Sequence, residues 1–353
     1  MDIYVLNKNL EIVGVVDTYI SVIWTSRYYK RGDFELYVSA MSDMLALLQT
    51  GFYLVRDKDI NGDEMQNVMI IKNIDLTTDP ENGNKLAVTG KSISSIVGQR
   101  VVASQTVLSG QFKSIVHLLL AENIVYPSLA ARGISNFEFE NVSGFDDNLD
   151  LQVTGDNLAE YLEALFEKYE YGWDVYIKGG KFIFTMYKGT DRSYNQNVNP
   201  HIVFSNEFDN LLNTDYQYLT EEFKNVAIVA GEGGGASRIK QVVGTATGIN
   251  RFETWVDAQG VSTNEGNITN AEYMAMLTDK GTEALTEYVN NELFDGETDV
   301  TTQYVLNRDF FLGDVVQVEN DFGISATARI LEIIESEDDS GTAVIPTFSA
   351  MEV

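Results

Sequence analysis

Apolar and polar residues alternate at both ends of the chain, and each alternating stretch begins with the same two-residue turn. The segment 32–38 starts with Gly-Asp and then places apolar residues at every second position, and the segment 313–318 repeats this arrangement. Such alternation is typical of a strand with one buried face. Two β-rich units with a shared turn motif therefore bracket the sequence.

The first 104 residues contain six or seven strand patterns and only short helical ones. Turn residues separate the strands, as in 57–63 and 80–83, and a short helix is predicted from Ser42 to Leu48. Many short strands with few helices are typical of a small barrel. We therefore predict a first β-barrel domain at 1–104.

The pattern changes near residue 105, where helical spacing begins. Apolar residues recur with the 3.6-residue period of a helix in 111–121 and again in 156–169, where Asp156 lies at the N-terminal end. A strand-turn-strand pattern follows at 172–187. These elements predict an α+β domain at 105–205.

Strand patterns return in the last part of the chain, but a helix interrupts them. The segment 269–292 is mostly one amphipathic helix, and Thr269 is a suitable N-cap. We predict a second β-barrel domain formed by 206–236 and 295–353, with a helical insertion at 237–294. The predicted fold class is α+β and β-rich: two small β-barrel domains in tandem, an α/β domain between them, and a helical insertion in the second barrel.

Composition excludes several classes of site. The 353 residues include no cysteine, which excludes a disulfide framework, a thiolate zinc site and a thiol nucleophile. The two histidines, His117 and His201, are interpreted as packed or surface residues. No apolar run reaches 18 residues, so we predict neither a membrane span nor stable membrane association.

Four polar segments resemble chemical sites, and each has a simpler interpretation. Asp57–Asp63 lacks the final glutamate of a calcium loop and is predicted to be a hairpin turn. Gly231–Gly235 resembles a phosphate-binding loop, but it places a glutamate where the phosphate would bind, so it is interpreted as a flexible hairpin connection. Asp146–Asp150 offers paired carboxylates for glycoside hydrolysis, but clusters of acidic residues are expected by chance in a chain that contains 53 of them. Glu335–Gly341 is interpreted as a solvated turn. We predict no enzyme activity, no cofactor and no metal site.

One compact cluster combines basic and aromatic residues: Tyr28, Tyr29, Lys30 and Arg31. Tyrosine and arginine are frequent at the energetic centres of protein interfaces. The cluster is therefore a candidate interaction site, although a strand end before a turn explains it equally well.

The net charge of −29 is unevenly distributed. It is −3 over 1–104, −6 over 105–205 and −20 over 206–353. Affinity for a nucleic-acid backbone comes mainly from lysine and arginine, so this surface should repel DNA rather than bind it. The simplest interpretation of this charge is general solubility.

Three motifs in order along the chain, within Ile23–Leu36, Leu86–Arg100 and Leu312–Ile333, resemble the siphophage tail hub family, also called the tail-associated protein at the baseplate centre. The resemblance implies a homotrimer in which paired barrels form a pseudo-sixfold ring. It implies a distal tail protein or tail tube protein on one side, a tip spike, fibre or receptor-binding protein on the other, and a tape measure protein as a further partner.

The predicted function is a structural hub at the distal tail tip of a phage or phage-derived particle. It would be assembled in the host cytoplasm, incorporated in the virion, and would form an acidic conduit that DNA crosses during genome ejection. Two alternatives remain open: a cell-wall-degrading glycoside hydrolase or peptidase of the tail tip, and a carbohydrate-binding adhesion module.

Overall fold

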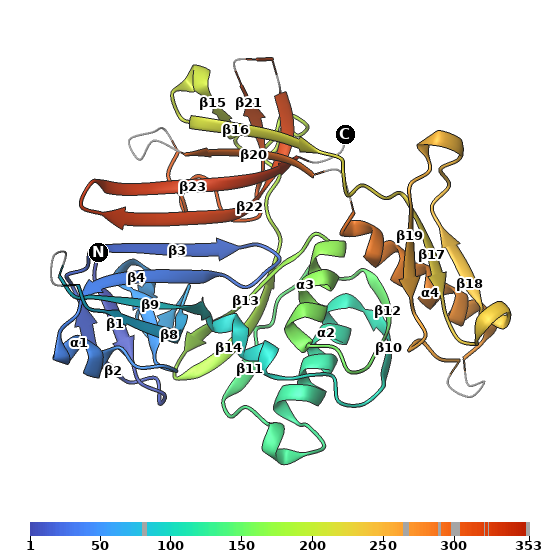
Figure 1. Cartoon of the computed structure of the whole chain (residues 1–353), viewed down its shortest axis with the longest axis horizontal. Helices are drawn as coiled ribbons and strands as arrows, with labels where there is room; N and C mark the ends of the chain where they lie inside the picture. The colour runs from blue at the N-terminus through green and yellow to red at the C-terminus, as the bar shows by residue number, and fades with distance from the viewer. Residues whose placement is uncertain are drawn as a thin grey trace.

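The computed structural model describes residues 1–79, 83–263, 268–288, 291–297, 304–320, 322–323 and 325–350. Strands dominate the left and top of Figure 1, helices pack beside strands at its centre, and a smaller unit with one helix lies at the right. The predicted β-rich α+β class is therefore confirmed. No helix of the described residues is both long enough and apolar enough to cross a membrane.

The regular structure of the first part of the chain is mostly strand. Its short helix α1 ends at Leu47, one residue before the predicted end. The elements are β1 (Ile3–Leu6), β2 (Ile12–Val16), β3 (Ser21–Arg27), β4 (Asp33–Ser39), α1 (Ser42–Leu47), β5 (Tyr53–Arg56), η1 (Asp57–Asp59), β6 (Ile60–Asn61), β7 (Glu64–Met65), β8 (Met69–Thr77), β9 (Lys85–Ser92) and η2 (Ile93–Gln99).

The middle part contains both predicted helices and the predicted hairpin. The side chain of Asn157, rather than that of Asp156, caps the second helix by accepting from the backbone N–H groups of Ala159 and Glu160. The elements are β10 (Thr106–Gln111), α2 (Phe112–Leu120), the π-helical turn η3 (Ala121–Val125), η4 (Ala130–Arg132), β11 (Phe137–Phe139), β12 (Asn148–Val153), α3 (Leu158–Lys168), β13 (Gly172–Lys178) and β14 (Lys181–Tyr187).

The last part returns to strands around one helix. Thr269 caps this helix as predicted, in a capping box with Glu272, and the helix ends at Thr286 rather than near residue 292. The elements are β15 (Val203–Ser205), η5 (Asn206–Phe208), β16 (Leu212–Leu219), β17 (Val226–Ala230), η6 (Gly235–Ser237), β18 (Lys240–Val243), η7 (Gly248–Asn250), β19 (Glu253–Asp257), α4 (Asn270–Thr286), β20 (Asn291–Glu297), β21 (Val315–Glu319), β22 (Ser325–Asp338) and β23 (Gly341–Ala350).

The β-rich units from the two ends of the chain share one sheet. Its strand order is β16-β20-β23-β22-β3-β4-β9-β8-β5-β1-β2, and β21 pairs with β22 and with β15. Among the described residues these pairings form an open path and do not close into a ring. The prediction of two closed barrels is therefore not confirmed.

Strand β22 explains why the sheet is continuous. Its first residues, Ser325–Arg329, pair with β21, whereas Glu332–Asp338 pair with Ser21–Arg27 of β3. A strand edge can hold only one neighbour at a time. Because β3 pairs with β22 beyond residue 331, that stretch is not available to close the C-terminal unit on itself.

Three smaller sheets complete the fold: β10-β12, β11-β14-β13-β7-β6 and β18-β17-β19. Strand β17 lies within the segment predicted for the second barrel, but it pairs with β18 and β19 in the small sheet at the right of Figure 1. Helix α4 packs on that sheet. The division into four domains otherwise stays a prediction.

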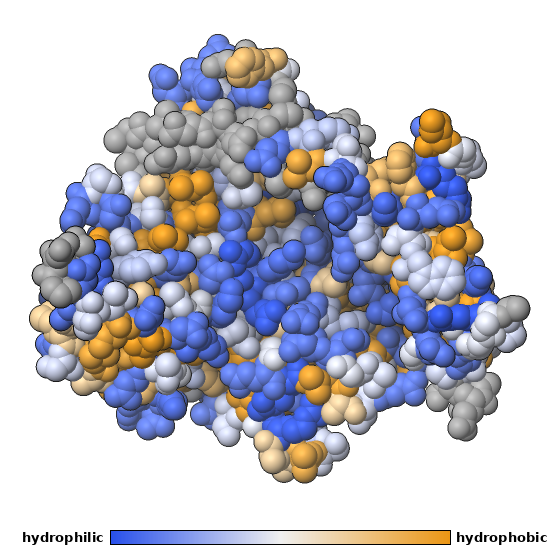
Figure 2. Space-filling view, in the orientation of Figure 1, coloured by the Kyte–Doolittle hydropathy of each residue, from blue (hydrophilic) through white to orange (hydrophobic). Residues whose placement is uncertain are grey.

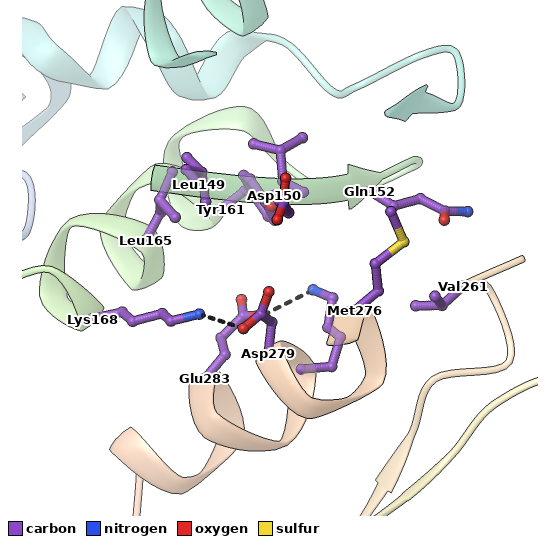
Figure 3. A pocket seen from close by; sticks show the side chains of 12 residues that line it. Leu149, Asp150, Gln152, Tyr161, Leu165, Lys168, Val261, Met276, Asp279 and Glu283 are labelled. Carbon is purple, nitrogen blue, oxygen red and sulfur yellow. Dashed lines mark hydrogen bonds and ion pairs between the residues drawn. The ribbon is translucent and has the colours of Figure 1, made fainter. Parts of the chain in front are cut away.

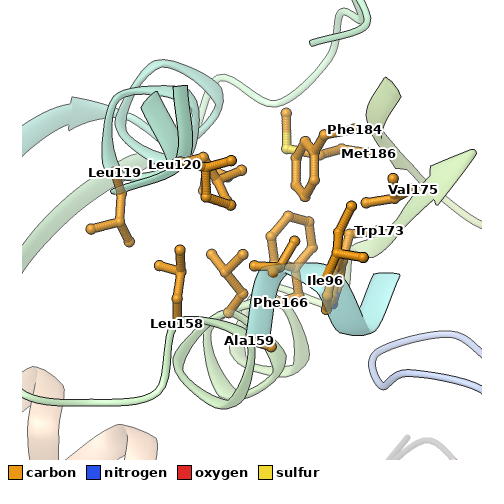
Figure 4. Close-up of a cluster of buried hydrophobic side chains, with 14 of the residues drawn as sticks. Ile96, Leu119, Leu120, Leu158, Ala159, Phe166, Trp173, Val175, Phe184 and Met186 are labelled. Atoms are coloured by element: carbon orange, nitrogen blue, oxygen red, sulfur yellow. The ribbon is translucent and has the colours of Figure 1, made fainter. Parts of the chain in front are cut away.

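The largest apolar core lies where α2 and α3 pack on β13 and β14, as Figure 4 shows. The rings of Phe112 and Phe166 meet edge to face at 5.1 Å, and the ring of Phe166 lies 6.4 Å from that of Phe184. All three side chains are fully buried. The 3.6-residue spacing in the sequence therefore identified the core faces of both helices.

Candidate functional site

The predicted interaction cluster lies in the connection from β3 to β4, where the two β-rich units meet the central α+β region. Tyr28 is completely buried, Tyr29 and Arg31 are half-buried, and Lys30 is exposed. Most of this surface therefore packs against the same chain. A contact with another protein at these residues stays a prediction, with Lys30 as the accessible member.

The ring of Tyr28 fills a space bounded by two glycines. A Cβ added to Gly172 would come within 2.4 Å of the ring, and one added to Gly313 within 2.1 Å. The Tyr28 hydroxyl donates to the carbonyl of Glu170 (3.2 Å) and accepts from the N–H of Gly189 (3.0 Å). One side chain thus joins β3 to the central region and to the C-terminal unit.

The neighbours of Tyr28 extend this junction. The indole N–H of Trp173 donates to the carbonyl of Tyr29 at 2.8 Å, and the Arg31 guanidinium pairs with Glu163 at 2.7 Å. Trp173 and Glu163 both belong to the central region. The basic-aromatic cluster is therefore a junction within the subunit, a role that its sequence pattern did not distinguish from partner binding.

Arg329 of β22 reaches the same junction from the C-terminal unit. Its guanidinium donates to the carbonyl of Gly313 (2.9 Å), pairs with Glu170 (2.7 Å), and lies 5.5 Å from the centre of the Tyr28 ring. These contacts combine hydrogen bonds with a cation–π interaction. All three parts of the chain therefore meet around one tyrosine.

The repeated Gly-Asp turn has a structural explanation at each position. Gly32 lies so close to its partner strand that a Cβ would come within 2.2 Å of the Thr25 carbonyl oxygen. Asp33 accepts from Arg27 (2.8 Å) and Lys91 (3.0 Å). Burial alone would raise the pKa of Asp33, but these two cations hold it below its usual value.

Asp314 occupies the corresponding position in the C-terminal unit and is almost fully buried. It accepts from the backbone N–H groups of Thr190 (2.7 Å) and Phe311 (3.0 Å) and from the guanidinium of Arg192 (2.7 Å). Both aspartates thus fix the start of a strand. The motif therefore marks two strand entries.

A buried charge network crosses the seam between β3 and β22. Arg56, which is 1% exposed, pairs with Asp59 and with Glu335 (2.7 Å), and Lys58 also contacts Glu335. Burial would raise the pKa of Glu335, but the two cations lower it below its usual value. The interpretation of Glu335–Gly341 as a solvated turn is wrong for Glu335, because β22 continues to Asp338.

The candidate calcium and phosphate loops serve other roles. Asp59 of the first loop binds Arg56 and accepts from the Asn67 amide at 2.9 Å, and the loop leads into the β6–β7 hairpin. In the second loop, Glu232 accepts from the N–H of Thr263 at 3.0 Å. The described residues contain no group of three or more His, Cys, Asp or Glu that could hold a metal ion.

The candidate hydrolase segment Asp146–Asp150 adjoins a small cavity. Asp147 accepts a hydrogen bond from the Tyr171 hydroxyl, and Asp150 lines a cavity of about 30 Å³ between β12, α3 and α4. Figure 3 shows Lys168 and Asp279 facing each other across this cavity, where their charges lie 3.6 Å apart. Such a volume holds a water molecule and is too small for a sugar ring.

A larger cleft of about 380 Å³ opens at the junction of the three regions, and a second, of about 340 Å³, lies beside α4. Asp174 lines the first cleft, and burial raises its pKa to about 6 although Ser94 and the Val175 N–H bind the carboxylate. Nothing in the sequence marked Asp174, which lies inside a strand pattern. The first cleft is lined by Ser26, Gln66, Asn67, Asp174, Thr185, Tyr187, Lys188, Thr190, Arg192, Leu306, Asn307, Phe311, Leu312, Asp314, Ile333 and Glu335.

The two histidines have the kinds of environment that the sequence predicted. The ring of His117 stacks on Phe139 at 4.6 Å, and burial together with the charge of Lys113 lowers its pKa. His201 is exposed, with its Nε2 atom 2.8 Å from the Gln196 carbonyl oxygen.

Comparison with known proteins identifies the fold and the family. The structure is similar to a tail protein from Neisseria meningitidis MC58 (14% identity, 98% of this chain and 95% of the other, TM-score 0.58). It is also similar to the prophage MuSo2 43 kDa tail protein from Shewanella oneidensis (11% identity, 99% of this chain and 98% of the other, TM-score 0.58). A third similar structure is the prophage tail protein gp18 from Listeria monocytogenes EGD-e (13% identity, 99% of this chain and 94% of the other, TM-score 0.52). These similarities show a shared fold along nearly the whole chain.

A search of curated proteins found no match. A family model does match, over residues 2–348, and it describes siphovirus ReqiPepy6 Gp37-like proteins. The match covers the junction around Tyr28, both Gly-Asp turns and the seam between β3 and β22. The chain therefore belongs to the siphovirus ReqiPepy6 Gp37-like protein family.

Proposed function

We propose that this protein is a structural hub at the distal end of a siphovirus-type phage tail, or of a phage-derived particle, assembled as a homotrimeric ring. Membership of a siphovirus family and a fold shared with several tail proteins support a role in the tail. In this role the contacts between subunits carry the function, and no bond is made or broken.

The continuous sheet is the observation that carries the proposal. Two β-rich units with matching Gly-Asp turns, about 280 residues apart in sequence, are joined side by side through β3 and β22. In the part of the chain that the structure describes, their sheet remains open, and open sheet edges favour pairing with another chain. Three copies, each with two such units, would close a ring of six β-rich modules, so the predicted barrels would be completed only between subunits.

Exposed apolar side chains at one end of the sheet support assembly. Strand β2 is the terminal strand of the path, and its Ile12 and Val13 are about half exposed. Met41 and Leu45 of the neighbouring α1 segment are also exposed, and Figure 2 shows the corresponding apolar surface at the lower left. Contiguous exposed apolar surface marks a contact site. We propose that tail neighbours, such as a distal tail or tail tube protein on one side and a spike or fibre on the other, cover surfaces of this kind.

The acidic charge supports a passage for DNA. Residues 206–353 carry 7 basic and 27 acidic side chains. Each contact between a cation and a phosphate releases counterions and would hold the duplex, so a passage should present few cations. The carboxylates facing the lumen would keep the genome moving during ejection, with no stable complex.

The proposal is tested by the mass and the symmetry of the assembly that the purified protein forms. Mass photometry is expected to give three times the 39.4 kDa chain, and negative-stain images should show threefold symmetry. Zymography on peptidoglycan in the same preparation separates the hub from the hydrolase. A monomer that clears peptidoglycan would refute the hub proposal.

A further inference from the structure

Helix α4 covers one face of the small sheet β18-β17-β19, and the other face is open at its centre, between the buried residues Val226 and Ala230. On the covered face, Tyr273 and Leu277 of α4 are fully buried, and Gly281 packs against Val243 and Val229. A three-stranded sheet needs such a partner to be stable. The covered face therefore accounts for the folding of this unit, and the other face is left for a different role.

An apolar row crosses the uncovered face. The strand register places Val242 of β18, Ile228 of β17 and Trp255 of β19 opposite one another. Trp255 is 53% exposed and Val242 is 50% exposed. An accessible tryptophan on a rigid strand is a typical anchor for a protein contact, because its large ring loses little conformational freedom on binding.

Two cations flank this tryptophan. The Nζ of Lys240 lies 5.3 Å and the guanidinium of Arg238 lies 6.0 Å from the ring of Trp255. Arg238 is fixed in place, because it donates to the carbonyls of Gly231 (2.9 Å) and Ala230 (2.7 Å) and pairs with the Asp257 carboxylate, so its charge is already neutralised within the chain and Lys240 is the cation that faces a partner. Two of the seven basic residues in the acidic region 206–353 thus lie at one exposed aromatic ring. Such a surface is complementary to an acidic segment that carries an aromatic side chain.

The chain itself carries such a segment directly after β15. Glu207, Phe208 and Asp209 are all exposed, and Phe208 is 52% exposed. The segment is a fixed turn, because the Ser205 hydroxyl accepts from the Phe208 N–H at 3.3 Å and the buried Asn210 side chain donates to a β15 carbonyl at 2.7 Å. An exposed phenylalanine between two carboxylates is therefore presented without an ordering cost on binding.

We propose that Glu207-Phe208-Asp209 of one subunit docks on the Trp255 face of the next subunit. The phenylalanine packs on the row of Val242 and Trp255, and a carboxylate of the segment approaches Lys240. Figure 1 places β15 and the β17–β19 sheet in separate parts of the molecule, which fits a contact between copies. Because the two surfaces differ, the contact is head-to-tail, and with the proposed threefold symmetry it closes into a ring. The inference rests on the proposed trimeric hub and names one of its interfaces.

Cysteine cross-linking tests the contact directly, because the chain contains no cysteine of its own. One preparation carries Lys240→Cys and a second carries Glu207→Cys, and the two are mixed and oxidised mildly. We expect a disulfide-linked pair in the mixture at least about fivefold above either preparation alone. Lys8→Cys, at an exposed lysine of the first β-rich unit, replaces Lys240→Cys in the control mixture. Equal yields in the two mixtures would overturn the proposal.

A charge exchange provides the second arm. Lys240→Glu or Glu207→Lys alone is expected to raise the concentration at which half the chain is trimeric by about tenfold, and the double exchange is expected to restore it. If both single variants assemble like the wild type, the Trp255 face binds something other than a second copy, such as another tail protein or a glycan, and the inference fails while the hub stands. If the wild-type chain forms no ring at any concentration, the hub proposal itself fails.

Discussion

Removing one oxygen atom, with Tyr28→Phe, is expected to weaken the junction of the three regions measurably. The hydroxyl is fully buried and serves two backbone groups, the N–H of Gly189 at 3.0 Å and the carbonyl of Glu170 at 3.2 Å. Burial raises the pKa of Tyr28, so the hydroxyl remains protonated and able to donate near neutral pH. The phenylalanine keeps the ring contacts, so the change isolates the two hydrogen bonds.

The expected loss follows from the two hydrogen bonds that the variant lacks. Each is worth about 1 kcal/mol, so the variant should lose about 2 kcal/mol of unfolding free energy. Urea unfolding followed by tryptophan fluorescence measures it, because Trp24 and Trp173 are buried at the seam and at the junction. With a slope of about 3 kcal/mol per M, the midpoint should fall by about 0.7 M.

The matched control is Tyr126→Phe, since Tyr126 is 83% exposed and its hydroxyl is open to water. We expect this variant to unfold at the wild-type midpoint. If Tyr28→Phe also leaves the midpoint unchanged, the hydroxyl does not join the regions, and the account of the junction is wrong.

Two further variants test the close packing and the buried charges. Gly189→Ala should abolish soluble expression or lower the melting temperature by more than about 5 °C, because the added Cβ would lie 1.6 Å from the Gly313 carbonyl oxygen. The control is Gly234→Ala, whose added Cβ meets open space, and it should change neither soluble expression nor the melting temperature. Glu335→Gln should cost about 3 kcal/mol at pH 7, because it removes a charge that neutralises buried Arg56. The pKa of Glu335 is lowered on folding, so its stabilisation is present above the ordinary value of 4.5 and is lost as the pH falls through the folded-state value. Unfolding midpoints of the wild type and Glu335→Gln should therefore converge in acid, and a constant difference down to pH 3 would contradict the assignment.

Local patterns predicted the elements well, because the causes of a helix or a hairpin lie within a few residues. The apolar spacing of 111–121 and 156–169 placed α2 and α3 within about two residues, and Thr269 was identified as an N-cap. The pairing of β22 with β3 could not be predicted in this way, because it joins residues more than 300 positions apart. The carboxylates near residue 335 indicated a solvated turn in the sequence. The prediction missed the ion pair of Glu335, because its partner Arg56 is distant in sequence and only the fold brings the two together.

The same limit explains the interaction cluster. Tyrosine and arginine have the same appearance in sequence whether they meet another protein or the far end of their own chain. At Tyr28 the distinguishing residues are Gly172 and Gly313, which leave room for its ring, and neither glycine is near it in sequence. For Trp255 the sequence predicted only a position within the helical insertion 237–294, and the strand register and α4 show that it lies on the face of the small sheet that α4 does not cover.

The distribution of these contacts determines which parts of the chain can move relative to one another. The two β-rich units are joined by seven consecutive residue pairs of β3 and β22, by the buried Arg56 network and by the Tyr28 junction, so they should behave as one rigid body. The β17–β19 unit meets the central region through α4, where cavities of about 30 Å³ and about 340 Å³ replace close packing. Interfaces with few buried contacts open at lower free energy than cores. In the proposed ring, a neighbouring subunit that binds the Trp255 face would therefore reorient this unit and leave the continuous sheet unchanged.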